Sequence, residues 1–293
     1  MEELKSEVIL DGLVFPEGPR WHDGKLWFSD QHSHKVHTVD ENGQSAVVVE
    51  LDDRPSGLGF LPDGRLLIAA THSRKLLRLD PDGLYELADL KEYAEEFIND
   101  MVTDAQGRSY IGARDMAMGS TRGGGRIVLV TPDGRAEVAT EETDLPNGTV
   151  ITQDGKTLIV AETGGHRLTA FDVDLADGSL RNRRPYATLD KSKFPDGICL
   201  DAEGGVWLGS PLTNEFLRVL EGGEVTHRIH YDDGKWAIAC ALGGADRRTL
   251  FLLTAYCSLE NLRRLSETSD DSSSESVGFI ETMRVDVPGA GIP

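Results

Sequence analysis

The chain has 293 residues, a formal net charge of −20 and 39% hydrophobic residues. A chain this acidic lacks the basic surface that nucleic-acid phosphates and anionic membranes attract, so we exclude both as partners. No apolar run approaches the ~18 residues of a membrane span, and no signal peptide precedes Val8, so we expect a cytoplasmic protein. The three cysteines, Cys199, Cys240 and Cys257, have neither zinc-type spacing nor an even count.

The first predicted element is a strand over Val8–Leu13, and a recurring motif follows it. Each copy of the motif is a polar residue, a short apolar strand, a tight turn and a second apolar strand. The turn residues of the six copies are Gly24, Gly64, Gly107, Gly155, Gly204 and, in a degenerate last copy, Arg247. Successive turns lie 40 to 49 residues apart. Units of this length with about four short strands are typical of propeller blades.

We therefore predict an all-β fold: a six-bladed β-propeller with four-stranded antiparallel blades, spanning 1–293 as a single domain. Pairs such as Asn42-Gly43 and Asp82-Gly83 supply the turns between third and fourth strands, because they tolerate the positive φ of tight hairpins. A closed ring needs its last blade completed by the other end of the chain. We expect Val8–Leu13 to pair with Gly278–Val285, which removes exposed sheet edges.

One segment departs from this pattern. Residues 266–277 are rich in serine and acidic side chains, a composition that cannot bury much surface. We predict a flexible loop, which lies between strands of the sixth blade on the face that carries the site. Whether it covers the site or is a solvated loop without a task stays open.

The repeat itself predicts a site. The first residue of each blade's innermost strand should lie near the central axis, so six residues distant in sequence converge there. These positions, counted back from the turns, are Glu17, Ser56, Asn99, Asn147, Asp196 and Ala239. Two carboxylates and two carboxamides then face one another. Any one of these residues alone would be typical of a turn. Oxygen-bearing side chains of this kind at four of the six matched positions favour a metal site.

The chemistry of these side chains indicates the kind of metal. Two clustered carboxylates repel each other, which raises the pKa of one of them. A hard divalent cation relieves this repulsion. Oxygen ligands that include neutral amides suit Ca²⁺ best, with Mg²⁺ and Mn²⁺ as alternatives. No histidine or cysteine falls in the register, which counts against a dedicated zinc site, although Zn²⁺ also binds oxygen ligands.

These motifs together resemble those of the SMP-30/gluconolactonase/LRE-like family of six-bladed, metal-dependent lactonases. The resemblance covers nearly the whole chain and rests on the motifs Phe15–Trp21, Leu26–Asp30, Asn99-Asp100, Leu145–Gly148, Pro195–Gly197 and Gly243–Asp246. It implies that Glu17, Asn147 and Asp196 bind the metal, and that Asn99 binds it or holds the substrate or a metal-bound water. It also implies that Asp196 moves protons during ring opening.

Lactone chemistry is consistent with those roles. A cation that touches the carbonyl oxygen stabilises the oxyanion formed on hydrolysis and lowers the pKa of bound water. A carboxylate beside it can take the water's proton and return it to the leaving alkoxide. Asp196 is the candidate for this role, with Glu17 as a pure ligand.

The chain departs from the sugar-lactone members at Phe97, where they commonly carry an arginine two residues before the asparagine of the third blade. Phe97 and Asn99 lie two residues apart on an extended segment and therefore share a face, so Phe97 should line the pocket. Replacing a donor with an apolar ring disfavours a sugar lactone. We predict a substrate less sugar-like than gluconolactone, such as a hydrophobic or aromatic lactone or another ester.

Further wall candidates come from loops and strand ends on the same face. Those we select as substrate-binding are His72, Arg114, Met116 and Trp236. The alternative for Met116 is packing in an irregular loop, for His72 surface solvation, and for Trp236 core packing. We expect a small-molecule lactone or ester as the partner, and a monomer or weak homo-oligomer.

Two other functions stay open. A related propeller hydrolase would act on phosphotriesters, with the same cation polarising the phosphoryl oxygen. A non-catalytic propeller would use the metal only to stabilise the ring and its face to bind a ligand or protein, since propellers serve both purposes.

Overall fold

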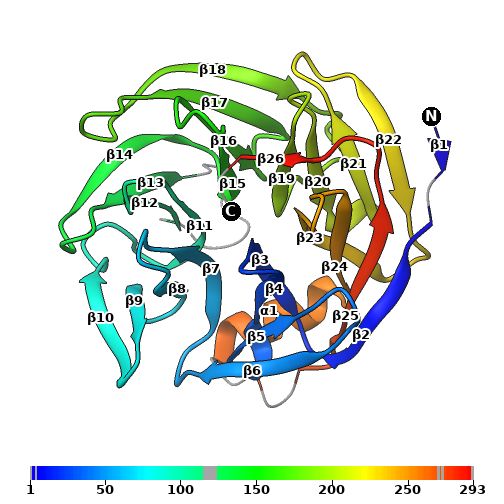
Figure 1. Ribbon diagram of the computed structural model, residues 1–293, viewed down its shortest axis with the longest axis horizontal. Helices are drawn as coiled ribbons and strands as arrows, with labels where there is room; N and C mark the ends of the chain where they lie inside the picture. Colours follow the sequence, from blue (N-terminus) through cyan, green and yellow to red (C-terminus); the bar gives the residue numbers. More distant parts are fainter. Residues whose placement is uncertain (1, 4, 115–123, 269–270, 272–273, 292–293) are drawn as a thin grey trace.

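Six sheets, antiparallel except for one short parallel pair, radiate from a central axis in the part of the chain that the structure describes (Figure 1). The structure is a computed structural model that describes all residues except 1, 4, 115–123, 269–270, 272–273 and 292–293. Five blades are built from four consecutive strands, and the sixth takes one strand from the chain's other end. The predicted six-bladed β-propeller is therefore confirmed.

The strands of each blade follow one another outward from the axis. The innermost strands are β3 (Pro16–His22), β7 (Pro55–Phe60), β11 (Phe97–Thr103), β15 (Pro146–Ile151), β19 (Ile198–Asp201) and β23 (Lys235–Gly243). The second strands are β4 (Lys25–Asp30), β8 (Leu66–Ala70), β12 (Ser109–Arg114), β16 (Thr157–Glu162), β20 (Val206–Ser210) and β24 (Thr249–Tyr256). The third strands are β5 (Lys35–Val39), β9 (Lys75–Asp80), β13 (Gly125–Val130), β17 (Arg167–Val173), β21 (Glu215–Val219) and β25 (Val277–Arg284). The outermost strands are β6 (Ser45–Glu50), β10 (Gly83–Asp89), β14 (Ala136–Thr143), β18 (Leu180–Thr188), β22 (Val225–His230) and β2 (Glu7–Leu13).

The ring closes as predicted. Strand β2 pairs antiparallel with β25, with Leu10 opposite Ile280 and Leu13 opposite Gly278, and so becomes the outer strand of blade six. Two short strands extend the fifth blade: β1 (Glu2–Glu3) lies parallel to β22, and β26 (Gly289–Ala290) pairs with the innermost β19. Interlocking the two ends of the chain covers sheet edges that would otherwise be open.

The core is divided into six apolar clusters, each between two neighbouring blades. Both faces of each sheet are covered, so second strands such as β8 are buried along their whole length. Large side chains on the second strands fill these interfaces, and Trp207 and Tyr110 are almost fully buried there. Packing of blade on blade therefore fixes where the inner strands sit around the axis.

Helix α1 (Leu259–Thr268) follows β24, and two 3₁₀ turns, η1 (Gln31–Ser33) and η2 (Pro211–Thr213), follow β4 and β20. The backbone N–H of Asn261 donates to Ser258 Oγ at 3.1 Å, so Ser258 caps the N-terminus of α1. Leu262 packs against the apolar cluster between blades six and one.

The predicted loop over 266–277 is corrected at its start, because α1 continues through Thr268. The serine-rich composition hid a helix whose capping residue and first apolar residues lie just before it. Farther on, Asp271 is 7% exposed. Its carboxylate accepts from Arg54 Nε at 2.5 Å and lies 2.8 Å from His34 Nε2, so this part of the segment is anchored on blades one and two.

Candidate metal centre

The innermost strands carry the site positions on a common irregularity. In five blades the ladder between innermost and second strand shifts register beside the site residue, as between Glu17 and Arg20 or between Pro146 and Thr149. Such a bulge re-aims the side chain at that point. The site residues are therefore set apart from the alternating in-and-out pattern of ordinary strand positions.

Neighbouring innermost strands approach each other closely at the site. The N–H of Gly148 donates to Asp196 O at 3.2 Å, and the N–H of Gly197 donates to Ile238 O at 3.0 Å. A Cβ at Gly148 would lie 2.5 Å from Asp196 O, and a Cβ at Gly197 would lie 2.3 Å from the Cβ of Ala239. Gly148 and Gly197 are thus required because neighbouring strands leave no space for a Cβ. The pairs Asn147-Gly148 and Asp196-Gly197 are not turns.

Glu17 and Asp196 come close enough to influence each other's ionisation. Burial raises the pKa of Glu17 well above its usual value, and the negative charges of Asp196 and Asp100 raise it further. Burial also raises the pKa of Asp196, to about 8, with a further rise from Asp100 and an opposing hydrogen bond from Asn147. The pair therefore has a large electrostatic cost that positive charge would relieve.

Asn147 presents an unpaired oxygen at this point. Its Nδ2 lies 3.4 Å from Thr163 Oγ1, which in turn donates to Pro195 O at 2.7 Å. Its Oδ1 is buried and has no hydrogen-bond partner among the described residues. Buried polar atoms are rarely left unpaired in proteins, so we expect the Asn147 oxygen to bind a ligand.

Asn99 is held differently. Its Oδ1 accepts from Ser56 Oγ at 3.0 Å, and Ser56 Oγ accepts from Gln31 Nε2 at 3.2 Å. The chain of bonds joins the site positions of blades two and three to the end of β4. Asn99 is thus oriented by protein partners, whereas the Asn147 oxygen is not.

A buried carboxylate positions the segment that leads to Glu17. Asp30, at the end of β4, is 2% exposed and accepts the N–H of Phe15 at 2.6 Å and that of Val14 at 3.1 Å. Its other oxygen accepts from Ser33 Oγ at 2.7 Å. These bonds fix the chain directly before the site residue.

The last residues of two other second strands act in the same way. Glu162 on β16 accepts the N–H of Asp144 at 2.8 Å, three residues before Asn147. Ser210 on β20 accepts the N–H of Phe194 at 3.2 Å, two residues before Asp196. The three positions with oxygens available to a ligand are therefore each supported from their own blade's second strand.

The donor set fits a hard divalent cation. Two carboxylates with raised pKa values and an unpaired amide oxygen offer only oxygen ligands, as Ca²⁺ prefers. Among the described residues no three His, Cys, Asp or Glu side chains form a metal-binding group. A cation here would therefore depend on asparagine oxygen, which suits zinc poorly.

Two further charged residues at the axis escaped sequence reasoning. Arg20 Nη2 donates to Asp100 Oδ1 at 3.0 Å, and both side chains are buried. Burial raises the pKa of Asp100, while Arg20 opposes that rise. A signal was present in the sequence: Asp100 follows a site residue where the copies containing Glu17, Ser56, Asn147 and Asp196 have glycine.

Phe97 and Arg114 lie opposite each other on β11 and β12. The Arg114 guanidinium carbon lies 5.2 Å from the centre of the half-buried Phe97 ring, and Arg114 Nε lies 3.7 Å from Glu96 Oε2. The Phe97 ring thus has the Arg114 guanidinium above it, in the arrangement of a cation–π contact. Met116 lies outside the described residues.

The other two wall candidates lie in different surroundings. His72 lines a cavity of about 570 Å³ between blades one and two, together with His34 and Arg54, and its Nε2 is buried without a partner among the described residues. Trp236 is 7% exposed and packs in the apolar cluster between blades six and one, beside Phe15.

Comparison with known proteins gives a consistent picture. Residues 15–256 match the family described as SMP-30/Gluconolactonase/LRE-like region. The chain is 26% identical over 270 residues to regucalcin of Bos taurus, covering 89% of this chain and 90% of that protein. It is 26% identical over 298 residues to 6-deoxy-6-sulfogluconolactonase of Pseudomonas putida, covering 100% and 99%. The solved structure of a calcium-binding protein, regucalcin from Agrobacterium tumefaciens, matches with a TM-score of 0.75 at 21% identity, covering 98% and 97%.

Within the described part of the chain, no helix has the length and apolar character needed to cross a membrane.

Proposed function

The chain belongs to the SMP-30/gluconolactonase/LRE-like family, and from this premise we propose that it is a divalent-metal-dependent hydrolase that opens lactones. The observation that carries the proposal is the grouping of Glu17, Asp196 and the unpaired oxygen of Asn147 at the propeller axis. The relative named 6-deoxy-6-sulfogluconolactonase, aligned over the full chain, supports lactone as the substrate class.

In this proposal Glu17, Asn147 and Asp196 hold the cation, with Ca²⁺ as the first choice. When bound, the cation supplies Lewis-acid polarisation of the lactone carbonyl and positive charge that lowers the pKa of nearby acids. Glu17 is 7% exposed and one oxygen of its carboxylate accepts the N–H of Gly18 at 3.1 Å, which suits a fixed ligand. Asn99, already oriented by Ser56, holds the substrate or the attacking water.

Asp196 transfers the proton. It is less buried than Glu17, and its burial beside Asp100 raises its pKa to about 8 without a cation. A bound cation would lower that pKa, so the ionised carboxylate could accept a proton near neutral pH. It takes a proton from the attacking water as the C–O bond to the carbonyl carbon forms. It returns that proton to the ring oxygen as the ring C–O bond breaks, which gives the hydroxy acid.

Phe97 and Arg114 form one wall of the proposed pocket. The ring offers no hydrogen bond to sugar hydroxyls, and the guanidinium is already stacked on the ring and close to Glu96. We therefore propose a lactone that carries an apolar or aromatic group in place of several hydroxyls.

The test is a substrate panel with controlled metal content. The protein is treated with a chelator, dialysed, and assayed with Ca²⁺, Mg²⁺, Mn²⁺ or Zn²⁺ added singly. The substrates are gluconolactone, aliphatic lactones, an aromatic lactone and a phosphotriester. We expect metal-dependent hydrolysis with aromatic or aliphatic lactones preferred. Equal or better turnover of gluconolactone would refute the role of Phe97. Preference for the phosphotriester would favour that chemistry, and no turnover of any substrate would favour a binding propeller.

A further inference from the structure

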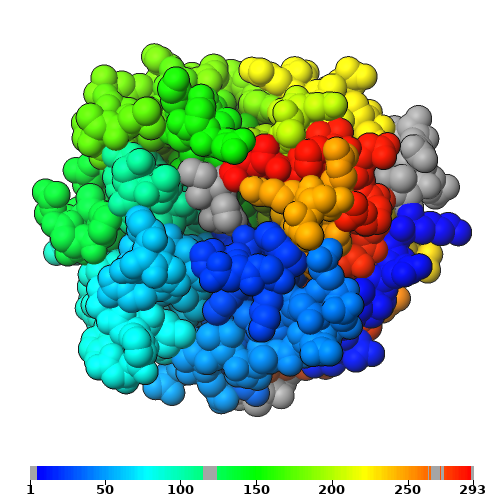
Figure 2. Space-filling view, viewed as in Figure 1, coloured from blue at the N-terminus to red at the C-terminus, as the bar shows by residue number. Residues whose placement is uncertain are grey.

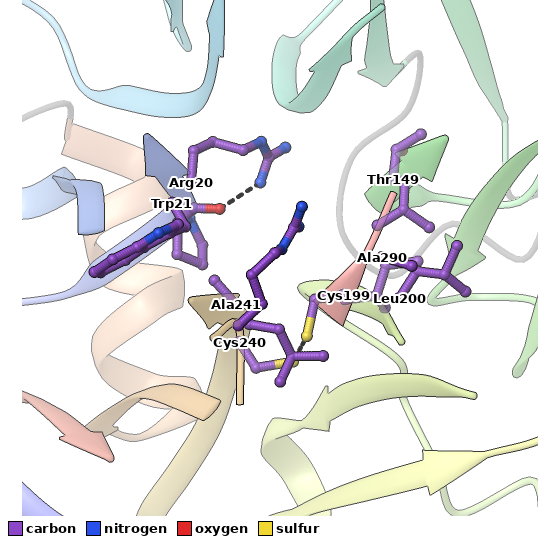
Figure 3. Close-up of a pocket in the computed structure, with 13 residues that line it drawn as sticks. Arg20, Trp21, Thr149, Cys199, Leu200, Cys240, Ala241 and Ala290 are labelled. Carbon is purple, nitrogen blue, oxygen red and sulfur yellow. Dashed lines mark hydrogen bonds between the residues drawn. The ribbon is translucent and has the colours of Figure 1, made fainter. Parts of the chain in front are cut away.

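A cavity lies on the propeller axis among residues that follow the site positions along the innermost strands (Figure 3). Its volume is about 30 Å³, room for one or two water-sized particles. Arg20 of β3 and Arg247 of the β23–β24 turn both line it, and the labelled Arg20 side chain extends toward the open centre in Figure 3. The C-terminal strand β26 contributes Ala290 to its wall.

Arg247 occupies a position where the rest of the repeat requires glycine. The corresponding turn residues in the other blades all have positive φ: Gly24, Gly64, Gly107, Gly155 and Gly204. Arg247 adopts the same left-handed conformation, with φ of 57°. A bulky residue is disfavoured in this conformation, so arginine costs backbone strain here that glycine would not.

The Arg247 guanidinium has no protein partner among the residues that the structure describes. Its side chain makes no hydrogen bond or ion pair with any residue that the structure describes, and its Nε is buried. Only its backbone is held, with the carbonyl accepting the N–H of Gly289 on β26 at 2.7 Å. A partly buried guanidinium without a counter-charge is costly unless an anion reaches it.

Arg20 also breaks the pattern of the repeat. It lies opposite Trp27 in the ladder of blade one. The equivalent ladder positions in the other blades hold Gly59, Val102, Ile151, Cys199 and Leu242. Arg20 is 5% exposed; its Nη1 donates to Pro19 O at 2.7 Å, and its Nη2 donates to Asp100 and to Met101 O. Its buried Nε has no partner among the described residues.

From these observations we propose that the axial cavity binds a small monovalent anion of about the size of chloride, held between Arg20 and Arg247. The two guanidinium groups supply N–H donors and positive charge from two blades that meet in the closed ring. The cavity volume admits a single small anion such as a halide. Arg20 already has Asp100 as a counter-charge, so the anion chiefly compensates the charge of Arg247.

The experiment follows thermal unfolding of the full chain in halide-free buffer during titration with sodium chloride or bromide. Sodium sulfate at matched ionic strength reports the general salt effect. We expect halide to raise the Tm in a saturable way, by about 2–4 °C once its concentration exceeds the dissociation constant roughly tenfold. Crystals soaked in bromide should show anomalous scattering between the two guanidinium groups.

Arg247→Gly is the informative variant, because it restores the residue found in the other five turns and removes the charge. It should fold and lose the saturable halide response. Arg248→Gln is the matched control, since it removes a charge one residue away, outside the cavity lining, and should keep the response. Equal responses in wild type and Arg247→Gly, or identical effects of halide and sulfate, would overturn the proposal and leave a cavity filled with water.

Discussion

The two ends of the propeller axis are built from the same strands but carry opposite charge. At the site end, Glu17 and Asp196 occupy positions that the repeat itself defines. Arg20 farther along β3 and Arg247 in the β23–β24 turn occupy positions where five other blades have apolar residues or glycine. The acidic residues at the site end therefore follow from the sequence repeat. The arginines at the other end occur where single blades depart from that repeat.

The ends also differ in how they are held. Buried acceptors such as Asp30 and Glu162 tie the segments that lead to the site. At the other end, Figure 2 shows the β23–β24 turn (orange) and the C-terminal segment (red) close to the β3–β4 hairpin (dark blue). There the exposed pair Asp246–Arg284 flanks Arg247. Substitutions at the site end should consequently change activity and stability more than substitutions at the other end.

The largest expected effect is on turnover. Asp196→Asn keeps the size of the side chain but removes the group that carries the proton, so kcat/KM for the preferred lactone should fall ~10²–10⁴-fold. The measurement is steady-state hydrolysis at saturating metal, with circular dichroism to confirm folding. Asp190→Asn is the control, because Asp190 is an exposed carboxylate six residues earlier in the same segment. Full activity in Asp196→Asn would remove it from the mechanism.

The second effect is on cation binding. Added Ca²⁺ should raise the Tm of chelated protein, and Glu17→Gln should weaken Ca²⁺ by at least the roughly 10–100-fold that loss of an outer-shell partner costs. Calorimetric titration of both proteins measures the change. Arg247→Gly should bind Ca²⁺ like wild type, and a matching loss of Ca²⁺ affinity in both variants would contradict separate ion sites.

These contrasts show what the sequence could and could not predict. The spacing of turns predicted the ring, its closure and the six axial positions, because a blade is a local unit repeated along the chain. The repeat could not show that the Asn147 oxygen is unpaired while that of Asn99 is bonded to Ser56, since those are contacts between blades. Helix α1 was missed because its capping serine adjoins a segment whose composition indicated a loop.

The third effect is on stability through backbone packing at the site. Gly148→Ala places a Cβ 2.5 Å from Asp196 O and should lower the free energy of unfolding by about 1–3 kcal/mol. Denaturant unfolding measures the loss, and hydrolysis should fall as Asn147 and Asp196 separate. Gly24→Ala is the comparison, because its Cβ meets nothing within 4 Å and its cost comes only from a φ of 74°. A smaller loss in Gly148→Ala than in Gly24→Ala would contradict tight strand contact.

The smallest effect is expected at the opposite end, from the exposed ion pair that flanks Arg247. The side-chain hydrogen bond from Arg284, followed by the backbone N–H of Arg248, lowers the pKa of Asp246 to about 2. Because the folded pKa lies below the unfolded value of about 3.9, the pair's contribution is fully present above that value and is lost as pH falls through 2. Asp246→Asn should therefore lower the Tm slightly at pH 7, and this difference should shrink as the pH falls from about 3.9 toward 2. NMR titration of the Asp246 carboxyl checks the cause directly, and a midpoint near 3.9 would show that the pair does not form in solution.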